Sequence, residues 1–198
     1  IEYLQIQVLD LASGAVVTQL DIPIRVGEKV NALVHPTSQK VNLSVGDSIT
    51  TSVVVSNIGN TPATFNLWLD DSNRGELTFQ LETPGVIQIG AGYDETVRIR
   101  MTPSSEALAA TVYSATLWVS NADSGLNLSA DIIGNISEEH GIIVDTPLSL
   151  GVIPGTTQEV NFTLTNNGNL VEDIILETTV AGNWTVTSAY VPLNLDVD

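Results

Sequence analysis

Few residues in this sequence could do acid–base or transition-metal chemistry. The chain has two histidines, His35 and His140, and no cysteine. Neither histidine has a second His or a Cys nearby, so a His/Cys metal site is not expected. Asp70 and Asp71 are adjacent and would point to opposite sides of a strand, and no nucleophile motif, phosphate loop or triad spacing occurs. We therefore predict no catalytic residue and no enzymatic activity.

Two stretches rich in oxygen donors raise the question of calcium. Residues 70–76, "DDSNRGE", lack the ligand spacing of an EF-hand and include Arg74, a poor neighbour for a dication. Residues 137–145, "SEEHGIIVD", lie where two repeats are expected to join, and a calcium ion there would stiffen the joint. Solvated loops explain both stretches, so we predict no cofactor, with calcium as the alternative.

Five Asn-x-Ser/Thr sequons are candidate sites of N-glycosylation: Asn42, Asn127, Asn135, Asn161 and Asn183. Alternation along the expected strands places four of them on the solvent face, and Asn135 is expected near a linker. Chance accounts for part of this number, so their expected exposure is the better argument for attached glycans.

Two tryptophans are expected on a solvent-facing surface. Trp68 and Trp118 fall on the polar side of their alternating segments. If these segments are neighbouring strands, both indoles lie close together on the outer face of a sheet. Gln7 and Glu177 stand at the matching positions of the other repeats, so the fold does not require the pair. Exposed paired aromatics suit a contact with a sugar or a protein, but a Trp that lies flat on its own sheet is the explanation that we favour.

Antiparallel strands are expected to position these residues. Apolar and polar residues alternate with a period of two in segments such as 95–101, 113–120 and 160–165. Ser-Gly, Asn-Gly and Pro-Gly turn signals separate the segments, and only 104–110 indicates a helical turn. Many short strands without helices predict an all-β sandwich or barrel.

The sequence repeats itself with a period near that of one immunoglobulin-sized domain. "SNIGNT" at 56–61 returns as "TNNGNL" at 165–170. In each copy, the Gly-Asn pair is expected to supply the positive φ of a tight connection between two strands.

We therefore predict tandem immunoglobulin-like antiparallel β-sandwiches. Residues 1–35 would be the C-terminal strands of one repeat, 36–146 a complete repeat and 147–198 the N-terminal half of another. Prolines at His35–Pro36 and Thr146–Pro147 would stiffen the linkers. The Ile-Glu start is expected of a mature or excised segment. We expect flanking sequence to complete the outer repeats, with pairing between copies of the chain as the alternative.

One family resemblance is visible. "GTTQEVNFTLTNNGNLVEDIILETTVAGNWTV" at 155–186 resembles Ig-like domains found in tandem on bacterial and archaeal surface proteins, of the cell-adhesion-related (CARDB) and NPCBM-associated types. The shared features are a Gly before an alternating strand, a Thr-Asn strand end, a Gly-Asn turn and a later Asn-Trp. "TPSSEALAATVYSATLWVS" at 102–120 is similar to the turn and Tyr-bearing strand of such domains. The resemblance covers most of the chain and implies a fold, not catalytic or binding residues.

The net charge of −17, from 23 acidic and 6 basic residues, would repel nucleic acids and anionic lipids. No apolar run is long enough to insert into a membrane. We predict a non-catalytic segment of an extracellular surface protein: a stalk, an adhesin or a surface-layer component. Its partners would be neighbouring Ig-like repeats, glycans or surface proteins. The alternatives are an accessory module of a secreted polysaccharide-degrading enzyme and a subunit of an extracellular filament.

Overall fold

The computed structural model describes residues 2–71, 76–109, 111–146, 151–177 and 192–197, together with 179, 182 and 185. Throughout these residues, every regular element is a β-strand, which confirms the predicted all-β class. Among them there is also no helix of the length and apolarity that a membrane crossing needs.

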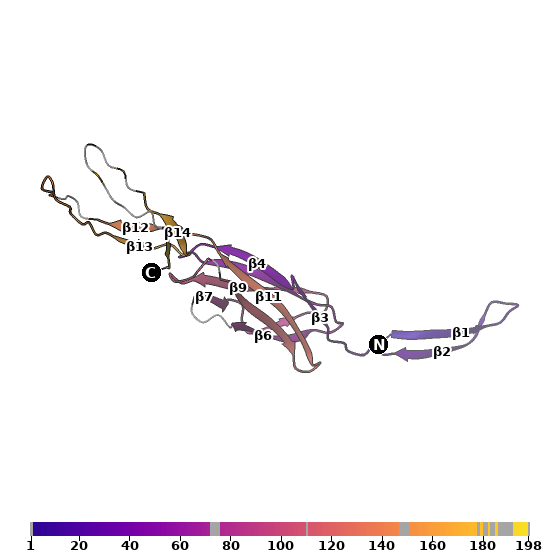
Figure 1. The fold of residues 1–198 in the computed structure, drawn as a ribbon. Helices are drawn as coiled ribbons and strands as arrows, with labels where there is room; N and C mark the ends of the chain where they lie inside the picture. The colour runs from indigo at the N-terminus through magenta and orange to yellow at the C-terminus, as the bar shows by residue number, and fades with distance from the viewer. Residues whose placement is uncertain are drawn as a thin grey trace.

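The central strands form a two-layer sandwich (Figure 1). Its strands are β3 (Ala32–His35), β4 (Ser38–Leu43), β5 (Ile49–Asn57), β6 (Ala63–Asp71), β7 (Leu77–Leu81), β8 (Val86–Ile89), β9 (Asp94–Pro103), β10 (Tyr113–Asn121) and β11 (Leu126–Ile136). One layer has the order β3-β5-β9-β7 and the other the order β4-β11-β10-β6-β8. The ladders are antiparallel except that between β4 and β11. A first strand divided between both layers and a two-sheet core make the fold immunoglobulin-like.

The central sandwich begins and ends earlier in the chain than the predicted bounds 36–146. β3 pairs with β5, so residues 32–35 belong to the central sandwich and not to a preceding repeat. The cis His35–Pro36 peptide therefore lies inside the sandwich, where the chain leaves one layer for the other, and not in a linker. Likewise β12 (Ile142–Asp145) pairs with β13 (Thr163–Asn166), beyond the central sandwich. Pro147 lies outside the described residues.

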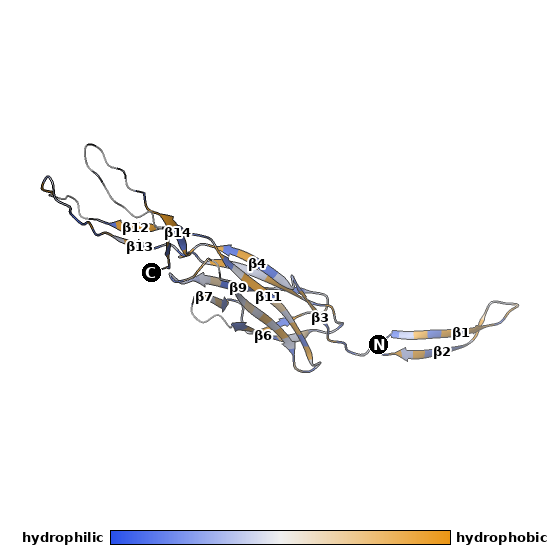
Figure 2. Cartoon of the chain, viewed as in Figure 1, coloured by the Kyte–Doolittle hydropathy of each residue, from blue (hydrophilic) through white to orange (hydrophobic). Residues whose placement is uncertain are grey.

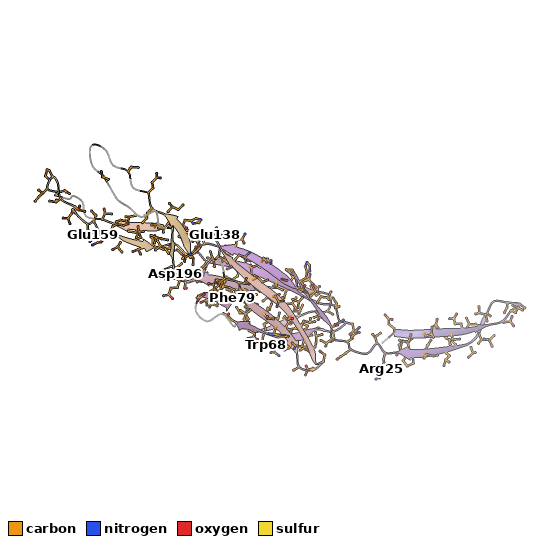
Figure 3. The ribbon with its side chains drawn as sticks, in the orientation of Figure 1. Arg25, Trp68, Phe79, Glu138, Glu159 and Asp196 are labelled. Carbon is orange, nitrogen blue, oxygen red and sulfur yellow. The ribbon has the colours of Figure 1, made fainter. Side chains whose placement is uncertain are left out.

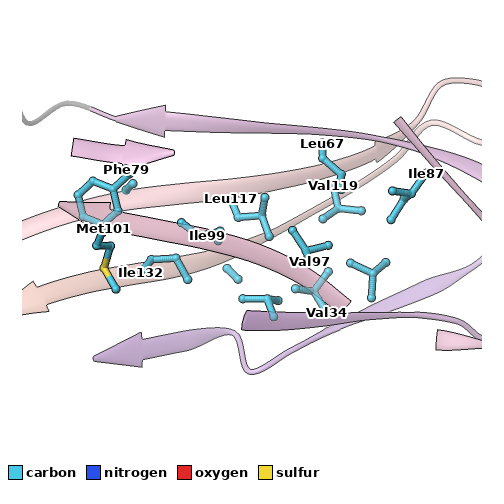
Figure 4. Packing of buried hydrophobic residues seen from close by; sticks show 14 of the residues in the cluster. Val34, Leu67, Phe79, Ile87, Val97, Ile99, Met101, Leu117, Val119 and Ile132 are labelled. Carbon is cyan, nitrogen blue, oxygen red and sulfur yellow. The ribbon is translucent and has the colours of Figure 1, made fainter. Parts of the chain in front are cut away.

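The alternating residues of the strands build the core, as their pattern predicts. Val97, Ile99 and Met101 of β9 are fully buried, and they face Leu117 and Val119 of β10, which are also fully buried (Figure 4). Each such aliphatic side chain stabilises the fold by about 1.5–3 kcal/mol relative to an exposed position. This core fixes which side of β6, β10 and β11 faces solvent.

A buried tyrosine at the start of β10 is hydrogen-bonded to the chain that precedes the strand. Tyr113 is 2% exposed, and its hydroxyl donates to Glu76 Oε2 at 2.6 Å and accepts from the Leu108 amide at 2.9 Å. A Tyr that binds upstream backbone in this way is the tyrosine corner of immunoglobulin-like domains. The upstream segment contains a hydrogen-bonded turn, from Ala107 N–H to Ser104 O, where a helical turn was expected.

Two smaller parts lie at opposite ends of the sandwich (Figure 1). In the hairpin of β1 (Glu2–Leu9) and β2 (Val16–Ile24), apolar and polar residues alternate, seen as orange and blue bands in Figure 2; on its apolar face Leu4, Ile6 and Val8 are 45–52% exposed. At the other end are β12 with β13, and β14 (Glu172–Ile175) with β15 (Pro192–Leu195). β13 begins at Thr163, three residues later than the alternation from 160 predicts, and Phe162 is 43% exposed.

Candidate functional site

The repeated Asn-x-Gly-Asn stretch binds the segment by which the chain enters the central sandwich. Asn60 follows the end of β5, and its Oδ1 accepts from the Lys29 amide at 2.6 Å. Its Nδ2 donates to the Gly27 carbonyl at 2.9 Å. The backbone adds bonds from Asn60 N–H to Lys29 O and from Ile58 N–H to Asn31 O, each at 3.0 Å. We call residues 57–60, together with the linker 27–31 that they hold, the first linker clasp.

The second copy of the stretch makes the same bonds. Asn169 Oδ1 accepts from the Glu139 amide at 2.8 Å, and Asn169 Nδ2 donates to the Ser137 carbonyl at 2.8 Å. Asn169 N–H donates to Glu139 O at 3.0 Å, and Asn167 N–H donates to Gly141 O at 2.9 Å. Residues 166–169 and the linker 137–141 form the second linker clasp. The sequence repeat is therefore a repeat of a junction, not only of a turn.

The glycines of the two clasps serve a different purpose from the one expected. Gly59 and Gly168 are not among the residues with positive φ, and no described residue other than glycine has one. A Cβ on Gly59 would instead lie 2.2 Å from Lys29 O, and one on Gly168 would lie 2.3 Å from Glu139 O. Glycine is required here because the linker backbone approaches so closely.

A buried asparagine holds each clasp in shape. Asn57 is 1% exposed; its Oδ1 accepts from Gly59 N–H at 3.0 Å, and its Nδ2 donates to Ile89 O at 2.9 Å. Asn166, also 1% exposed, accepts from Gly168 N–H at 3.0 Å and donates to the carbonyl of Leu195 in β15 at 3.0 Å. Both copies of the sequence have an asparagine at this position, but the sequence alone indicates only a turn.

His140 of the second clasp makes an ion-pair contact with β14. Its Nδ1 lies 2.6 Å from Oε1 of Glu172, which is not part of the stretch 137–145. Among the described residues, no three His, Asp or Glu side chains come together as a metal site. Of the other calcium candidate, 70–76, residues 72–75 lie outside the described part of the chain.

The turn of the N-terminal hairpin repeats the turn between β10 and β11. Asp10 Oδ1 accepts from the amide and the hydroxyl of Ser13, each at 2.7 Å. Asn121 Oδ1 accepts from the amide of Ser124 at 2.8 Å and from its hydroxyl at 2.7 Å. The bond from the Ser13 hydroxyl, with those from the Ser13 and Ala12 amides, holds the pKa of Asp10 below its usual value. The β1–β2 hairpin is thus a second example of the β10–β11 hairpin.

Trp68 and Trp118 lie directly opposite each other on β6 and β10. Their ring centroids are 6.1 Å apart and their planes differ by 15°, so the indoles are stacked. Trp68 is 43% exposed and lies at the outer side of the sandwich (Figure 3). The structure confirms the predicted pairing of the two tryptophans on the solvent face.

Hydrogen-bonding side chains surround the indoles on the same face. Next to the pair along and across the strands are residues with hydroxyl, amide or carboxylate groups: Asn66, Asp70, Thr116, Ser120, Asn127, Ser129 and Asp131. Thr116 Oγ1 donates to Asp131 Oδ1 at 3.1 Å, which orients both groups. We call these seven residues and the two tryptophans the indole face.

The structure describes four of the five sequons. Asn42, Asn127, Asn135 and Asn161 are exposed, and Asn183 lies outside the described residues. Asn135 is not in a linker but in β11, where it is the register partner of Asn42 on β4. Its Nδ2 donates to Asn42 Oδ1 at 3.3 Å, so two sequons adjoin one another. Exposure is as predicted, and glycosylation stays a prediction.

Comparison with known proteins found similarity only to solved structures. No protein-family model and no curated protein matches the chain. The ASH/PapD-like domain 7 of human CEP192 is 12% identical, with a TM-score of 0.43 over 62% of this chain and 96% of that one. A chaperone–tip adhesin complex of CFA/I fimbriae biogenesis is 18% identical, with a TM-score of 0.38 over 83% and 82%. A family 123 glycoside hydrolase from Clostridium perfringens is 10% identical, with a TM-score of 0.41 over 54% of this chain and 27% of that one. At these values, the likeness says nothing of function in this chain.

Proposed function

We propose that this chain is a non-catalytic segment of an array of immunoglobulin-like units, in which the linker clasps hold successive units in a fixed orientation. The observation that carries the proposal is the duplication of the clasp. Lys29 and Glu139 are 110 residues apart in the numbering. Each exchanges the same pair of hydrogen bonds with the last asparagine of its own clasp, Asn60 or Asn169. A structural role at the junction explains why this motif occurs twice.

The clasps act where an array would otherwise bend. Units joined by a linker are expected to move relative to one another unless the interface is extensive. Each clasp ties several linker backbone groups to the next unit, and each intramolecular hydrogen bond stabilises by about 0.5–1.5 kcal/mol. The sum suffices to hold a short linker in one path, which suits a stalk or spacer.

The two outer parts support the division into repeats. The β1–β2 hairpin has the turn of β10–β11, and its exposed Ile6 and Val8 correspond to the buried Leu117 and Val119. An isolated hairpin is at best marginally stable in water, so this apolar face needs other strands to cover it. At the other end, β14 pairs with β15 as β6 pairs with β8. We propose that strands of further Ig-like units cover these faces; pairing between copies of the chain is the competing arrangement.

The same proposal assigns the segment to an extracellular surface protein. The resemblance to CARDB-type and NPCBM-associated domains, the exposure of four sequons and the charge of −17 all support this location. An accessory module of a secreted polysaccharide-degrading enzyme and a filament subunit remain the competing roles.

Spin labels can test the fixed junction. The chain has no cysteine, so Gln7→Cys on the hairpin and Gln88→Cys on the sandwich would be the only labelled sites. We expect one narrow distance distribution by double electron–electron resonance, which Asn60→Ala broadens. Asn127→Ala removes an exposed asparagine that is not part of the clasp; it is the matched control and should leave the distribution narrow. A broad distribution before any clasp substitution would exclude the fixed-junction role.

Antibody labelling can test the location. Antibodies raised against the 198-residue chain should label intact cells of the native source. Labelling that requires permeabilised cells would contradict the extracellular assignment without affecting the junction experiment.

A further inference from the structure

We propose that the indole face binds a neutral oligosaccharide. The proposal rests on the stacked pair Trp68 and Trp118 and on the hydroxyl, amide and carboxylate groups around them. It does not depend on the role of the chain in an array, because the linker clasps contain none of these residues.

The chemistry of the face matches that of a pyranose ring. A sugar ring presents C–H groups on its faces, which pack against the electron-rich face of an indole, and hydroxyl groups around its rim. The indole face has a matching arrangement, with an apolar centre and hydrogen-bonding groups around it. Asn66 and Ser120 are register partners on one side of the tryptophans, and Asp131 lies on the other side with the Thr116 hydroxyl bonded to it. The amide and hydroxyl groups donate and accept, and the carboxylates accept, as binding of sugar hydroxyls requires.

The charge of the face favours a neutral ligand. The described members of the indole face include two carboxylates, Asp70 and Asp131, and no Lys or Arg, and the whole chain has a charge of −17. An anionic polysaccharide would therefore be repelled.

The size of the apolar centre argues against a protein partner. A stable protein interface buries roughly 800 Å² on each side around a core of several apolar residues. Here the centre consists of two indoles and of Val86, which is 58% exposed opposite Asn66. The neighbours of the indoles along the strands, such as Asn66 and Ser120, are polar. The backbone groups of β6 and β10 are already paired within the sheet, so a partner strand could not add to this part of it.

The fold itself does not explain the pair. Gln7, at the position of Trp118 in the β1–β2 hairpin, forms a polar contact with Gln19 on the neighbouring strand. The fold therefore accepts a polar residue at the position of Trp118. The partner of Trp118, Trp68, is 43% exposed, so the pair is not needed to cover the core. Two adjoining exposed aromatic residues form a contiguous patch, and patches of this kind mark binding surfaces, unlike a single exposed side chain.

The test is binding to an array of neutral oligosaccharides of glucose, galactose, mannose and N-acetylglucosamine, followed by calorimetry with those bound. We expect the 198-residue chain to bind, and Trp68→Ala and Trp118→Ala each to weaken binding by about tenfold or more. Trp68→Phe should bind with intermediate affinity because it keeps an aromatic ring. Tyr93→Ala removes an aromatic side chain that is 72% exposed at another place and should bind as the unsubstituted chain does.

Three results would overturn the proposal. The first is no binding to any neutral oligosaccharide, and the second is binding that both Trp→Ala variants retain in full. The third is concentration-dependent self-association that Trp68→Ala abolishes, which would make the face a contact between copies of the chain. Thermal unfolding of each variant, with an unchanged melting temperature, excludes loss of the fold as the cause of weaker binding.

Discussion

Lys29 and Asn60 hold one another in a closed pair of hydrogen bonds. Lys29 N–H donates to Asn60 Oδ1 at 2.6 Å, and the backbone N–H of Asn60 donates to Lys29 O at 3.0 Å. The side chain of Asn60 also supplies a donor, since its Nδ2 donates to Gly27 O at 2.9 Å. The path of the linker thus depends on the Asn60 side chain together with the backbone of the clasp.

Removal of that side chain should free the linker. We expect Asn60→Ala to lower the hydrogen-exchange protection of the Lys29 amide, with a loss of about 1 kcal/mol for the bonds removed. Asn60→Asp keeps an acceptor for the Lys29 amide but loses the donor to Gly27, so its effect should be smaller. An unchanged exchange rate at Lys29 in Asn60→Ala would show that the side chain does not hold the linker. Amide exchange followed by NMR measures each case.

A methyl group at Gly59 should be more damaging than the loss of Asn60. The Cβ of Gly59→Ala would lie 2.2 Å from Lys29 O, so the linker backbone must move. We expect a cost of about 1–3 kcal/mol in the free energy of unfolding, measured with urea. Gly27→Ala, whose Cβ would meet nothing within 4 Å, is the matched control and should change stability little. Equal effects of the two substitutions would contradict the close-approach role of Gly59.

The sequence predicted the strands and the solvent face well because alternation records burial directly. Val97, Ile99 and Leu117 are buried and Trp68 is exposed, as their parity requires. The residues at which the central sandwich begins could not be predicted in the same way. Residues 32–35 alternate like any strand, and only their pairing with β5 shows to which sandwich they belong. Long-range pairing of this kind leaves no local signal.

Among the candidate sites, too, the alternation of residues predicted some features and not others. The Trp68–Trp118 pair was predictable because it needs only parity and the neighbouring position of two strands. The role of Gly59 was not, because a glycine needed for positive φ and one needed for close approach look the same in a sequence.

The turn of the N-terminal hairpin should depend on pH. The pKa of Asp10 is lowered by its bonds from Ser13 and Ala12, so the turn is stabilised at neutral pH, and this stabilisation is lost as the pH falls through the lowered pKa. We expect the Ser13 amide proton shift to titrate with a midpoint below 3.8, the ordinary value for Asp. Asp10→Asn should keep the turn, as Asn121 does in the equivalent hairpin, and abolish this titration. A midpoint at or above 3.8 in the unsubstituted chain would contradict the hydrogen-bonded carboxylate.

Adjacent sequons should compete for glycans. Asn42 and Asn135 are register partners with side-chain atoms 3.3 Å apart, so a glycan on one would crowd the other. We expect molecules from the native source to carry a glycan at one of the two at most, and Asn42→Gln to raise occupancy at Asn135. Asn127 is exposed on the far end of β11 and should be occupied independently. Intact-mass and glycopeptide analysis would show frequent double occupancy if the two sites do not interfere.

Tyr113 should give the central sandwich a stability that depends on alkaline pH. Burial, followed by the bond to Glu76, raises the pKa of Tyr113 above 10.0. The unfolded chain therefore loses this proton first, so the contribution is complete below pH 10.0 and is lost as the pH rises through the raised pKa. At neutral pH, Tyr113→Phe leaves Glu76 and the Leu108 amide without this partner and should cost about 1.5–3 kcal/mol. We expect that difference, measured by urea unfolding of both proteins from pH 7 to pH 11, to shrink above pH 10, because only the unsubstituted chain loses the contribution. A difference that stays constant across this range would show that the hydroxyl remains neutral in both states and that its bond to Glu76 is not linked to folding.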